Sequence, residues 1–313
     1  MLIVNAAGDK RSGYILMNVI FGLFFTLPLF LVVFKVPERS QFSKGRKSSW
    51  KEMFSTLRIK VFRRFMAMYL GIVMAMDITS MIFAYFMTYS LKRPDELQYV
   101  LGTLLVSQVA LVPLASWFAK KTSKNLAVIV GNIGWILFAS SSLLLTPESP
   151  AFLIYIIASF LGMFIGFSVI GYTSIFGDVT EVGEYHFGYR AEGSFTSIWQ
   201  FLRKCASALA NWLALTLLGI VGFISPLKIT ENGITQLVTQ SQNMAVQFTI
   251  KGIMGLNGIF LLIPATIIAM RWKLSKEKHT ALIDYLDRKR AGLEIDPQTE
   301  QKIEAICKPL IMG

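Results

Sequence analysis

The side chains with the clearest chemical potential lie together in the stretch GDVTEVGEYHFGYRAEG, residues 177–193. Two long apolar runs flank it, so its charge is concentrated within about one loop. Carboxylates next to a histidine are compatible with a metal site, a catalytic acid pair or a loop at a membrane surface. The ionisable residues are Asp178, Glu181, Glu184, His186, Arg190 and Glu192.

A second candidate is Asp77, in the apolar run MAMYLGIVMAMDITSMIFAYF. It follows Met66 by eleven residues, which at 1.5 Å per residue places it roughly 16 Å into a membrane. A carboxylate at that depth is costly and is therefore a candidate for function. It could accept sugar hydroxyls, bind a cation or carry a proton. The alternative is a structural carboxylate satisfied by a neighbouring helix.

A third candidate is a polar stripe in SFTSIWQFLRKCASALANWLAL. Gln200, Lys204, Ser207 and Asn211 recur at i, i+4, i+7 and i+11, which places them on one narrow face of a helix. Water or a polar solute could run along that face, with Lys204 in the polar cavity. Arg203 lies about 60° from the stripe and is predicted to snorkel to the headgroups. The alternative to a place for Lys204 in the polar cavity is that Lys204 also snorkels to the headgroups.

The elements that must position these residues are blocks of about twenty apolar residues, the length of a helix that crosses about 30 Å of hydrocarbon. The chain has 313 residues, 54% hydrophobic and 16% charged, so it has fewer charges than a soluble domain. We predict an all-α polytopic membrane protein with about seven transmembrane helices. The predicted spans are Gly13–Phe34, Met66–Leu91, Gln98–Phe118, Leu126–Leu145, Pro150–Phe176, Phe195–Ile224 and Thr249–Met270. Single polar residues in three of these spans, Gln108, Asn132 and Asn257, are predicted to hydrogen-bond between helices.

The positive charge is distributed unequally between the loops. With seven spans, 23 of the 31 Lys and Arg residues fall on one side, chiefly in residues 35–64 and 271–313. By the positive-inside rule that side is cytoplasmic, so the N-terminus is outside and the C-terminus is inside. The net charge of +12 is therefore a signal of topology and of contact with anionic lipid, and we expect no nucleic-acid partner.

The predicted organisation has four parts. Residues 1–34 form an external N-terminus and the first span. Residues 35–65 form a basic cytoplasmic linker with an amphipathic helix from Trp50 to Val61, which lies on the membrane surface or packs on the protein. Residues 66–270 form a six-helix bundle. Residues 271–313 form a cytoplasmic tail, helical over 275–291 and irregular over the last twenty or so residues.

The sequence also resembles a known family. The pattern D-V-T-E-x-G-E-Y-x-x-G-x-R-x-E-G, followed by a span that carries Lys204, is similar to that of the melibiose-permease family. Its members are glycoside–pentoside–hexuronide:cation symporters of the major facilitator superfamily. The pair Gly13–Tyr14, the run FKVPER and the loop WFAKKTSKN extend the resemblance over nearly the whole chain.

The resemblance implies that the seven spans are helices six to twelve of a twelve-helix fold, the C-terminal part of a transporter whose N-terminal half is missing. Lys204 matches a functionally important lysine of the eleventh helix. Asp178, Glu181, Arg190 and Glu192 match a charged cytoplasmic loop, with Glu181 where the family often has aspartate. We interpret this loop as a gate whose charges pair with the other half of the transporter.

The implied activity is secondary active transport: symport of a sugar or glycoside with Na⁺ or H⁺ by alternating access, in the cell membrane. No catalytic residue, bound metal or cofactor other than the coupling cation is expected. The chain is expected to be incomplete and not to transport alone.

Two rival functions remain. A major-facilitator transporter of a non-sugar solute is one. The other is a membrane enzyme or a non-transporting scaffold. Bound metal that is lost when Glu181 and His186 are changed together would favour the enzyme.

Overall fold

Long apolar helices make up most of the chain, because a backbone surrounded by hydrocarbon must satisfy its hydrogen bonds internally. The structure, a computed structural model, describes residues 10–35, 50–231 and 234–312. The prediction of a helical, polytopic membrane protein is confirmed at this level. Within the described residues, six helices are long and apolar enough to cross a membrane: Arg11–Lys35, Lys60–Ser90, Pro94–Lys121, Lys124–Leu144, Ala151–Phe187 and Met244–Met270.

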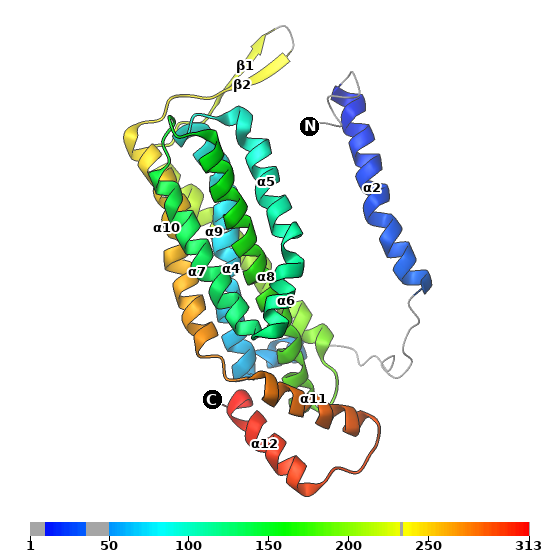
Figure 1. Cartoon of the computed structure of the whole chain (residues 1–313). Coiled ribbons are helices and arrows are strands. Elements are labelled where there is room, and N and C mark those ends of the chain that lie inside the picture. The colour runs from blue at the N-terminus through cyan, green and yellow to red at the C-terminus, as the bar shows by residue number, and fades with distance from the viewer. Residues whose placement is uncertain (1–9, 36–49, 232–233, 313) are drawn as a thin grey trace. The chain divides into compact units, whose positions relative to one another are not determined.

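The remaining predicted span, Phe195–Ile224, corresponds to helix α9 (Glu192–Ile220), which ends before Ile224 and is not among these six. With 29 residues, α9 is long enough for a crossing, but Arg203, Lys204 and Asn211 lower its mean hydropathy. It packs against helix α4 inside the bundle (Figure 1). The predicted number of seven therefore exceeds by one the number that length and composition support.

The chain divides into two units, residues 1–47 and 48–313. The first contains helix α2 (Lys10–Lys35). Large apolar side chains are exposed all around α2, among them Val19, Phe24 and Leu31. Such a helix is suited to contact with lipid on every side.

The second unit contains a helical bundle whose core is formed where neighbouring helices meet. Helix α4 packs against α9 and α10, α7 packs against α8 and α10, and α5 packs against α8. Its elements besides α9 are α4 (Lys60–Tyr85), the π-helical turn η3 (Phe86–Ser90), the 3₁₀ turn η4 (Pro94–Glu96), α5 (Leu97–Ala110), α6 (Val112–Lys121), α7 (Lys124–Ser141), the 3₁₀ turn η5 (Ser142–Leu144), α8 (Ala151–Phe187) and α10 (Met244–Met270).

The predicted span Gln98–Phe118 is broken into α5 and α6 at Leu111. Pro113 stands in the first turn of α6. A proline has no N–H to donate to the preceding turn, and its ring clashes with the carbonyl four residues earlier. The break is therefore a local consequence of the sequence.

Glycines allow the helices of the bundle to approach closely. A Cβ at Gly131 of α7 would lie 2.4 Å from Ser168 Oγ of α8, and one at Gly162 of α8 would lie 2.2 Å from the carbonyl oxygen of Leu104 in α5. Small residues at crossing points are how membrane helices gain packing contacts. A larger side chain at either glycine would push α8 away from its neighbour.

Single polar side chains tie these helices together. Asn132 of α7 accepts a hydrogen bond from Ser168 of α8 at 2.9 Å and donates to Thr266 of α10 at 3.1 Å. Asn257 of α10 donates to Thr79 of α4 at 3.3 Å. The prediction of interhelical hydrogen bonds is confirmed for Asn132 and Asn257. Among the described residues, the side chain of Gln108 forms no such bond.

The two ends of the bundle carry different structures. At one end, called the hairpin end, strands β1 (Leu227–Glu231) and β2 (Ile234–Val238) pair antiparallel, with Thr230 opposite Thr235 (Figure 1). At the other, called the tail end, lie α11 (Lys276–Arg290) and α12 (Pro297–Ile311). The hairpin lies between the predicted spans Phe195–Ile224 and Thr249–Met270, where the sequence analysis expected no regular element.

Two boundaries differ from the predictions. The amphipathic helix expected from Trp50 to Val61 is short: α3 (Trp50–Ser55) is followed by the 3₁₀ turn η2 (Thr56–Arg58), and fully buried Ile59 is extended before α4 begins at Lys60. The end of the tail is a helix, α12, and not irregular chain. Asp296 caps it, and Ile303, Cys307 and Leu310 form its buried face.

The docking of α12 predicts low reactivity for the thiol of Cys307. Burial raises the pKa of Cys307 to about 12, so the reactive thiolate is scarce at neutral pH. In a Cys205→Ala background, Cys307 should resist N-ethylmaleimide at pH 7.5 in the native protein and react after unfolding in dodecyl sulfate. Mass spectrometry measures the modification, and full labelling of the native protein would contradict the packing of α12.

Candidate functional site

An ion pair joins two helices in the apolar part of the bundle. Asp77 of α4 accepts hydrogen bonds from both terminal nitrogens of Arg203 of α9, at 2.6 Å and 2.9 Å. The side chains of Arg203 and Asp77 are 21% and 15% exposed. A bidentate guanidinium–carboxylate contact is a strong and geometrically specific pairing. It satisfies two charges that would each be costly alone in this setting.

This pairing corrects the prediction for Arg203. We expected that side chain to snorkel toward headgroups, but it turns inward to Asp77. Asp77 is thus held by a neighbouring helix, the structural alternative considered for it. Depth and helical angle located both residues, but the sequence alone cannot tell which face of α9 meets α4.

Aromatic rings surround the approach to this pair. Trp199 lies one helical turn before Arg203 on α9, and its ring centroid is 5.2 Å from that of Tyr69 of α4. Tyr69 also meets Tyr172 of α8 with centroids 5.1 Å apart. Edge-to-face contacts of this kind fix three helices around the ion pair.

The predicted polar stripe of α9 lies on the outer side of the bundle. Gln200 and Lys204 are exposed, while Ser207 and Asn211 are half-buried. The buried face of α9 is formed instead by small and apolar residues such as Ala206, Ala210 and Ala214. The stripe and the ion pair therefore occupy different sectors of the same helix, with Arg203 turned inward and Lys204 outward.

A second polar cluster lies at the tail end, on the last turns of α8. Oδ1 of Asp178 accepts a hydrogen bond from the ammonium of Lys124 at 2.5 Å and lies 3.2 Å from Nε2 of His279 in α11. The same His279 nitrogen also contacts the carboxylate of Glu181. Helix α8 has 37 residues, more than about 30 Å of hydrocarbon requires. Its extra turns therefore carry these carboxylates to the helices beyond the apolar layer.

Glu184, a turn further along α8, binds the tail helix more firmly. Arg290 of α11 donates to its two carboxylate oxygens at 2.9 Å and 2.6 Å. This hydrogen bonding raises the pKa of Arg290 above its usual range, so the charge of Arg290 is permanent. Arg190 lies 3.7 Å from Glu184 and also contacts Glu192 at the start of α9.

These contacts change the interpretation of the stretch 177–193. Asp178 and Glu181 belong to helix α8, which ends at Phe187, and Gly188 closes it with a left-handed φ of 72°. The sequence predicted partners in another half of a transporter. The partners seen for Asp178 and Glu181 lie in this chain, on α7 and α11.

Asp178, Glu181 and His279 offer ligand atoms within 4.8 Å of one another, a spacing that a metal ion could occupy. The ammonium of Lys124 at 2.5 Å from Asp178 already supplies a positive charge there, and it would repel a cation. The sequence missed His279, because nothing in the tail indicates that α11 folds back on α8.

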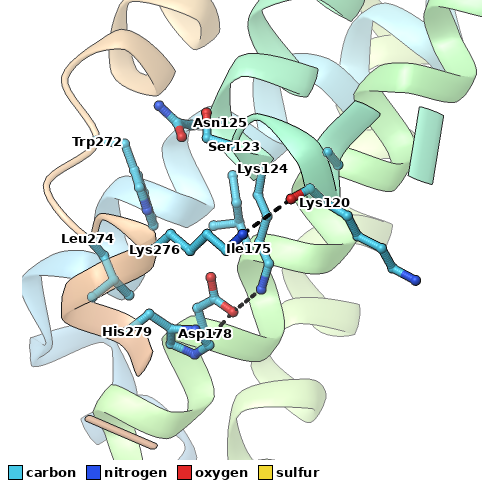
Figure 2. Close-up of a pocket in the computed structure, with 11 residues that line it drawn as sticks. Lys120, Ser123, Lys124, Asn125, Ile175, Asp178, Trp272, Leu274, Lys276 and His279 are labelled. Atoms are coloured by element: carbon cyan, nitrogen blue, oxygen red, sulfur yellow. Dashed lines mark hydrogen bonds and ion pairs between the residues drawn. The ribbon is translucent and has the colours of Figure 1, made fainter. Parts of the chain in front are cut away.

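A cavity of about 210 Å³ opens beside this cluster. Figure 2 shows its walls, which come from the turn between α6 and α7, from α8, and from the segment between α10 and α11 together with the start of α11. Its lining residues include Lys120, Ser123, Lys124, Ile175, Asp178, Trp272, Leu274, Lys276 and His279. This cavity is called the tail-end cavity.

Comparison with known proteins gives one family. The sequence matches the family described as MFS/sugar transport protein over residues 1–276. An uncharacterized symporter of Bacillus subtilis, YjmB, is 26% identical over 229 residues, which cover 69% of this chain and 44% of the relative. The sodium-dependent lysophosphatidylcholine symporter 1 of Mus musculus is 22% identical, with 86% and 49% covered. A lactose permease of Lactobacillus delbrueckii subsp. bulgaricus is 28% identical, with 65% and 31% covered. The matches thus span less than half the length of each of these relatives.

The ion pair predicts coupled effects of substitution. Asp77→Asn and Arg203→Gln should each lower the free energy of unfolding by roughly 2 kcal/mol, less than for a fully buried pair because both side chains are partly exposed. The double variant should lose less than the sum of the two, because no charge is left alone. Thermal unfolding in detergent, followed by circular dichroism, measures this. Strictly additive losses would show that the two residues do not interact.

The Glu184–Arg290 contact predicts that α11 depends on α8 for its protection. Glu184→Gln should increase amide hydrogen exchange across Lys276–Arg290 by about fivefold or more, because a charge-assisted pair is replaced by a weaker contact. The matched control is Asp287→Asn, which removes the exposed partner of the same arginine and should change exchange little. Equal effects of the two variants would contradict the dominant role of Glu184.

Proposed function

Because this chain belongs to the family of MFS/sugar transport proteins, we propose that it takes part in cation-coupled symport of a sugar or glycoside. Membership places it among multi-pass membrane transporters rather than enzymes. The proposed mechanism is alternating access, with Na⁺ or H⁺ as the coupling cation and no other cofactor. The relatives named as a symporter and as a lactose permease support this interpretation at the level of the family.

The observation that carries the proposal is the exposed polar stripe of α9. Gln200 and Lys204 face away from the core of the bundle, in a helix that lies among apolar spans. Exposure of a lysine and an amide to hydrocarbon would cost free energy, so that face needs water or further protein against it. A solute pathway bounded on one side by α9 meets that requirement.

The residues of the pathway then have distinct roles. Lys204, with Gln200, Ser207 and Asn211, would line the solute path. Asp77 would act through Arg203, which holds α4 against α9 and keeps Lys204 turned outward. Asp77 and Arg203 thus form a positioning pair rather than a direct contact with the solute.

The finer assignment is also a proposal. The chain would correspond to the C-terminal part of a melibiose-permease-like transporter, helices six to twelve, with the tail end in the cytoplasm and the N-terminus outside. A second bundle, outside this chain, would cover the stripe of α9 and complete the path. The outward direction of that stripe and the partial coverage of the relatives support the second bundle. The resemblance of the sequence supports the helix numbering, and the unequal positive charge supports the orientation. In it, Asp178, Glu181, Arg190 and Glu192 lie at the cytoplasmic gate.

A non-sugar solute is the second candidate. The mouse relative is named as a lysophosphatidylcholine symporter, so a similar chain is associated with an amphiphilic, charged solute. Uptake competition with a panel of glycosides and lysophospholipids, in a complete transporter that contains this bundle, distinguishes the two. Competition by glycosides alone supports the sugar, and competition by lysophospholipids alone supports the second candidate. Absence of uptake of either would favour a scaffold.

Lys204 provides the sharpest test of the pathway. In a complete transporter that contains this bundle, Lys204→Ala should lower coupled uptake at least about tenfold, because it removes the charge from the polar face. The measurement is accumulation of labelled solute in proteoliposomes with an imposed cation gradient.

The matched control is Cys205→Ala, at an adjacent exposed position of α9 that lies off the stripe and should retain uptake. Both variants should insert into the membrane at normal levels. Normal uptake by Lys204→Ala would remove Lys204 from the pathway, and accumulation by the 313-residue chain alone would contradict the need for a second bundle.

A further inference from the structure

The tail-end cavity has an amphipathic lining. Ile175, Trp272 and Leu274 form its apolar wall, and lysines, Ser123 and the end of α7 form its polar side (Figure 2). Trp272 of its lining follows the last residue of the apolar helix α10, Met270, by two positions in the chain. A cavity with this lining at the end of a membrane-spanning helix lies at the level of the lipid headgroups. There it can contact both a headgroup and the start of the apolar chain.

The charge of the lining is not balanced. Asp178 is the single carboxylate in it, and that carboxylate is engaged by Lys124 and His279. The ammonium of Lys276 donates to the carbonyl oxygen of Lys120 at 3.3 Å, a neutral partner. In the part of the chain that the structure describes, neither Lys120 nor Lys276 forms an ion pair with a carboxylate.

The segments around the cavity extend this excess. Residues 117–125 and 271–279 together hold seven Lys and Arg residues and one acidic residue, Glu277. The N-terminus of α7 adds to it, because Ser123 caps only the amide of Leu126 and leaves the first amides of the helix free to face an anion. Four to eight basic residues next to a membrane helix are typical of sites for anionic headgroups.

We propose that the tail-end cavity binds a phosphate group. Lys276 supplies positive charge within the cavity, and the first amides of α7 supply hydrogen-bond donors. Lys120, whose ammonium is directed outward in Figure 2, adds positive charge at the rim. Lys124 stays with Asp178 and holds α7 against α8, so that the site remains formed when it is empty. The apolar wall of Trp272 and Leu274 would receive the part of a ligand nearest to its phosphate.

Two sources could provide this group. One is the headgroup of an anionic phospholipid such as phosphatidylglycerol, which the apolar wall and the position beside α10 favour. The other is a soluble phosphate, which would use the same ammonium groups without the wall. The site is separate from the polar stripe of α9, so it goes beyond the proposed solute pathway and its test requires no transport.

The test uses the full 313-residue chain in nanodiscs of phosphatidylcholine with or without phosphatidylglycerol. Native mass spectrometry after transfer to detergent measures retained phosphatidylglycerol, and calorimetry measures binding of inorganic phosphate. The unchanged chain should retain phosphatidylglycerol in preference to phosphatidylcholine. The double variant Lys120→Gln/Lys276→Gln should lower that retention about tenfold or more, because it removes both uncompensated charges.

The matched control is Lys278→Gln, which removes one charge from an exposed position of α11 outside the cavity lining. It should retain the lipid as the unchanged chain does, and thermal unfolding should show that all the variants are folded. Binding of inorganic phosphate without retention of phosphatidylglycerol, lost in the double variant, would assign the site to a soluble phosphate. Binding of neither probe, or equal binding by the double variant and the unchanged chain, would overturn the proposal. An equal loss of lipid retention in Lys278→Gln would also overturn the proposal, since the effect would then come from general surface charge.

Discussion

The Asp77–Arg203 ion pair is the contact on which the proposed pathway depends. An ionised side chain among apolar helices requires an opposite charge, a hydrogen-bond partner or water. Arg203 finds its partner on α4, and this choice fixes the rotation of α9 about its axis. With Arg203 turned inward, Lys204 is turned outward. One ion pair therefore decides which face of α9 is available to a solute.

The same requirement shapes the tail end, where the extra length of α8 matters. The last turns of α8 present Asp178, Glu181 and Glu184 to basic side chains on α7 and α11, namely Lys124, His279 and Arg290. Because two of the three partners lie on α11, the tail helix becomes part of the bundle instead of a free extension. The tail-end cavity is a consequence of that docking, since α11 supplies one of its walls.

Neutral polar groups and glycines complete the bundle between these two charged regions. Asn132 links three helices, and Gly131 and Gly162 remove the side chains that would separate α8 from α7 and α5. Apolar burial alone gives little preference for one helix over another in a membrane. Close packing and a few hydrogen bonds therefore supply the specificity of the arrangement.

The sequence by itself determined the helical membrane class, most of the spans and the residues able to carry charge within them, because length and hydropathy act locally along the chain. It also indicated the interhelical role of Asn132, but it did not predict the break between α5 and α6, which falls inside one predicted span. It did not determine partners. That Asp77 meets Arg203, that Glu184 meets Arg290 and that His279 reaches Asp178 each depend on how helices far apart in sequence rotate and pack. The short α3, the helical end of the tail and the tail-end cavity were likewise decided only by the tertiary structure, because burial against distant segments outweighs the weak local pattern of these stretches.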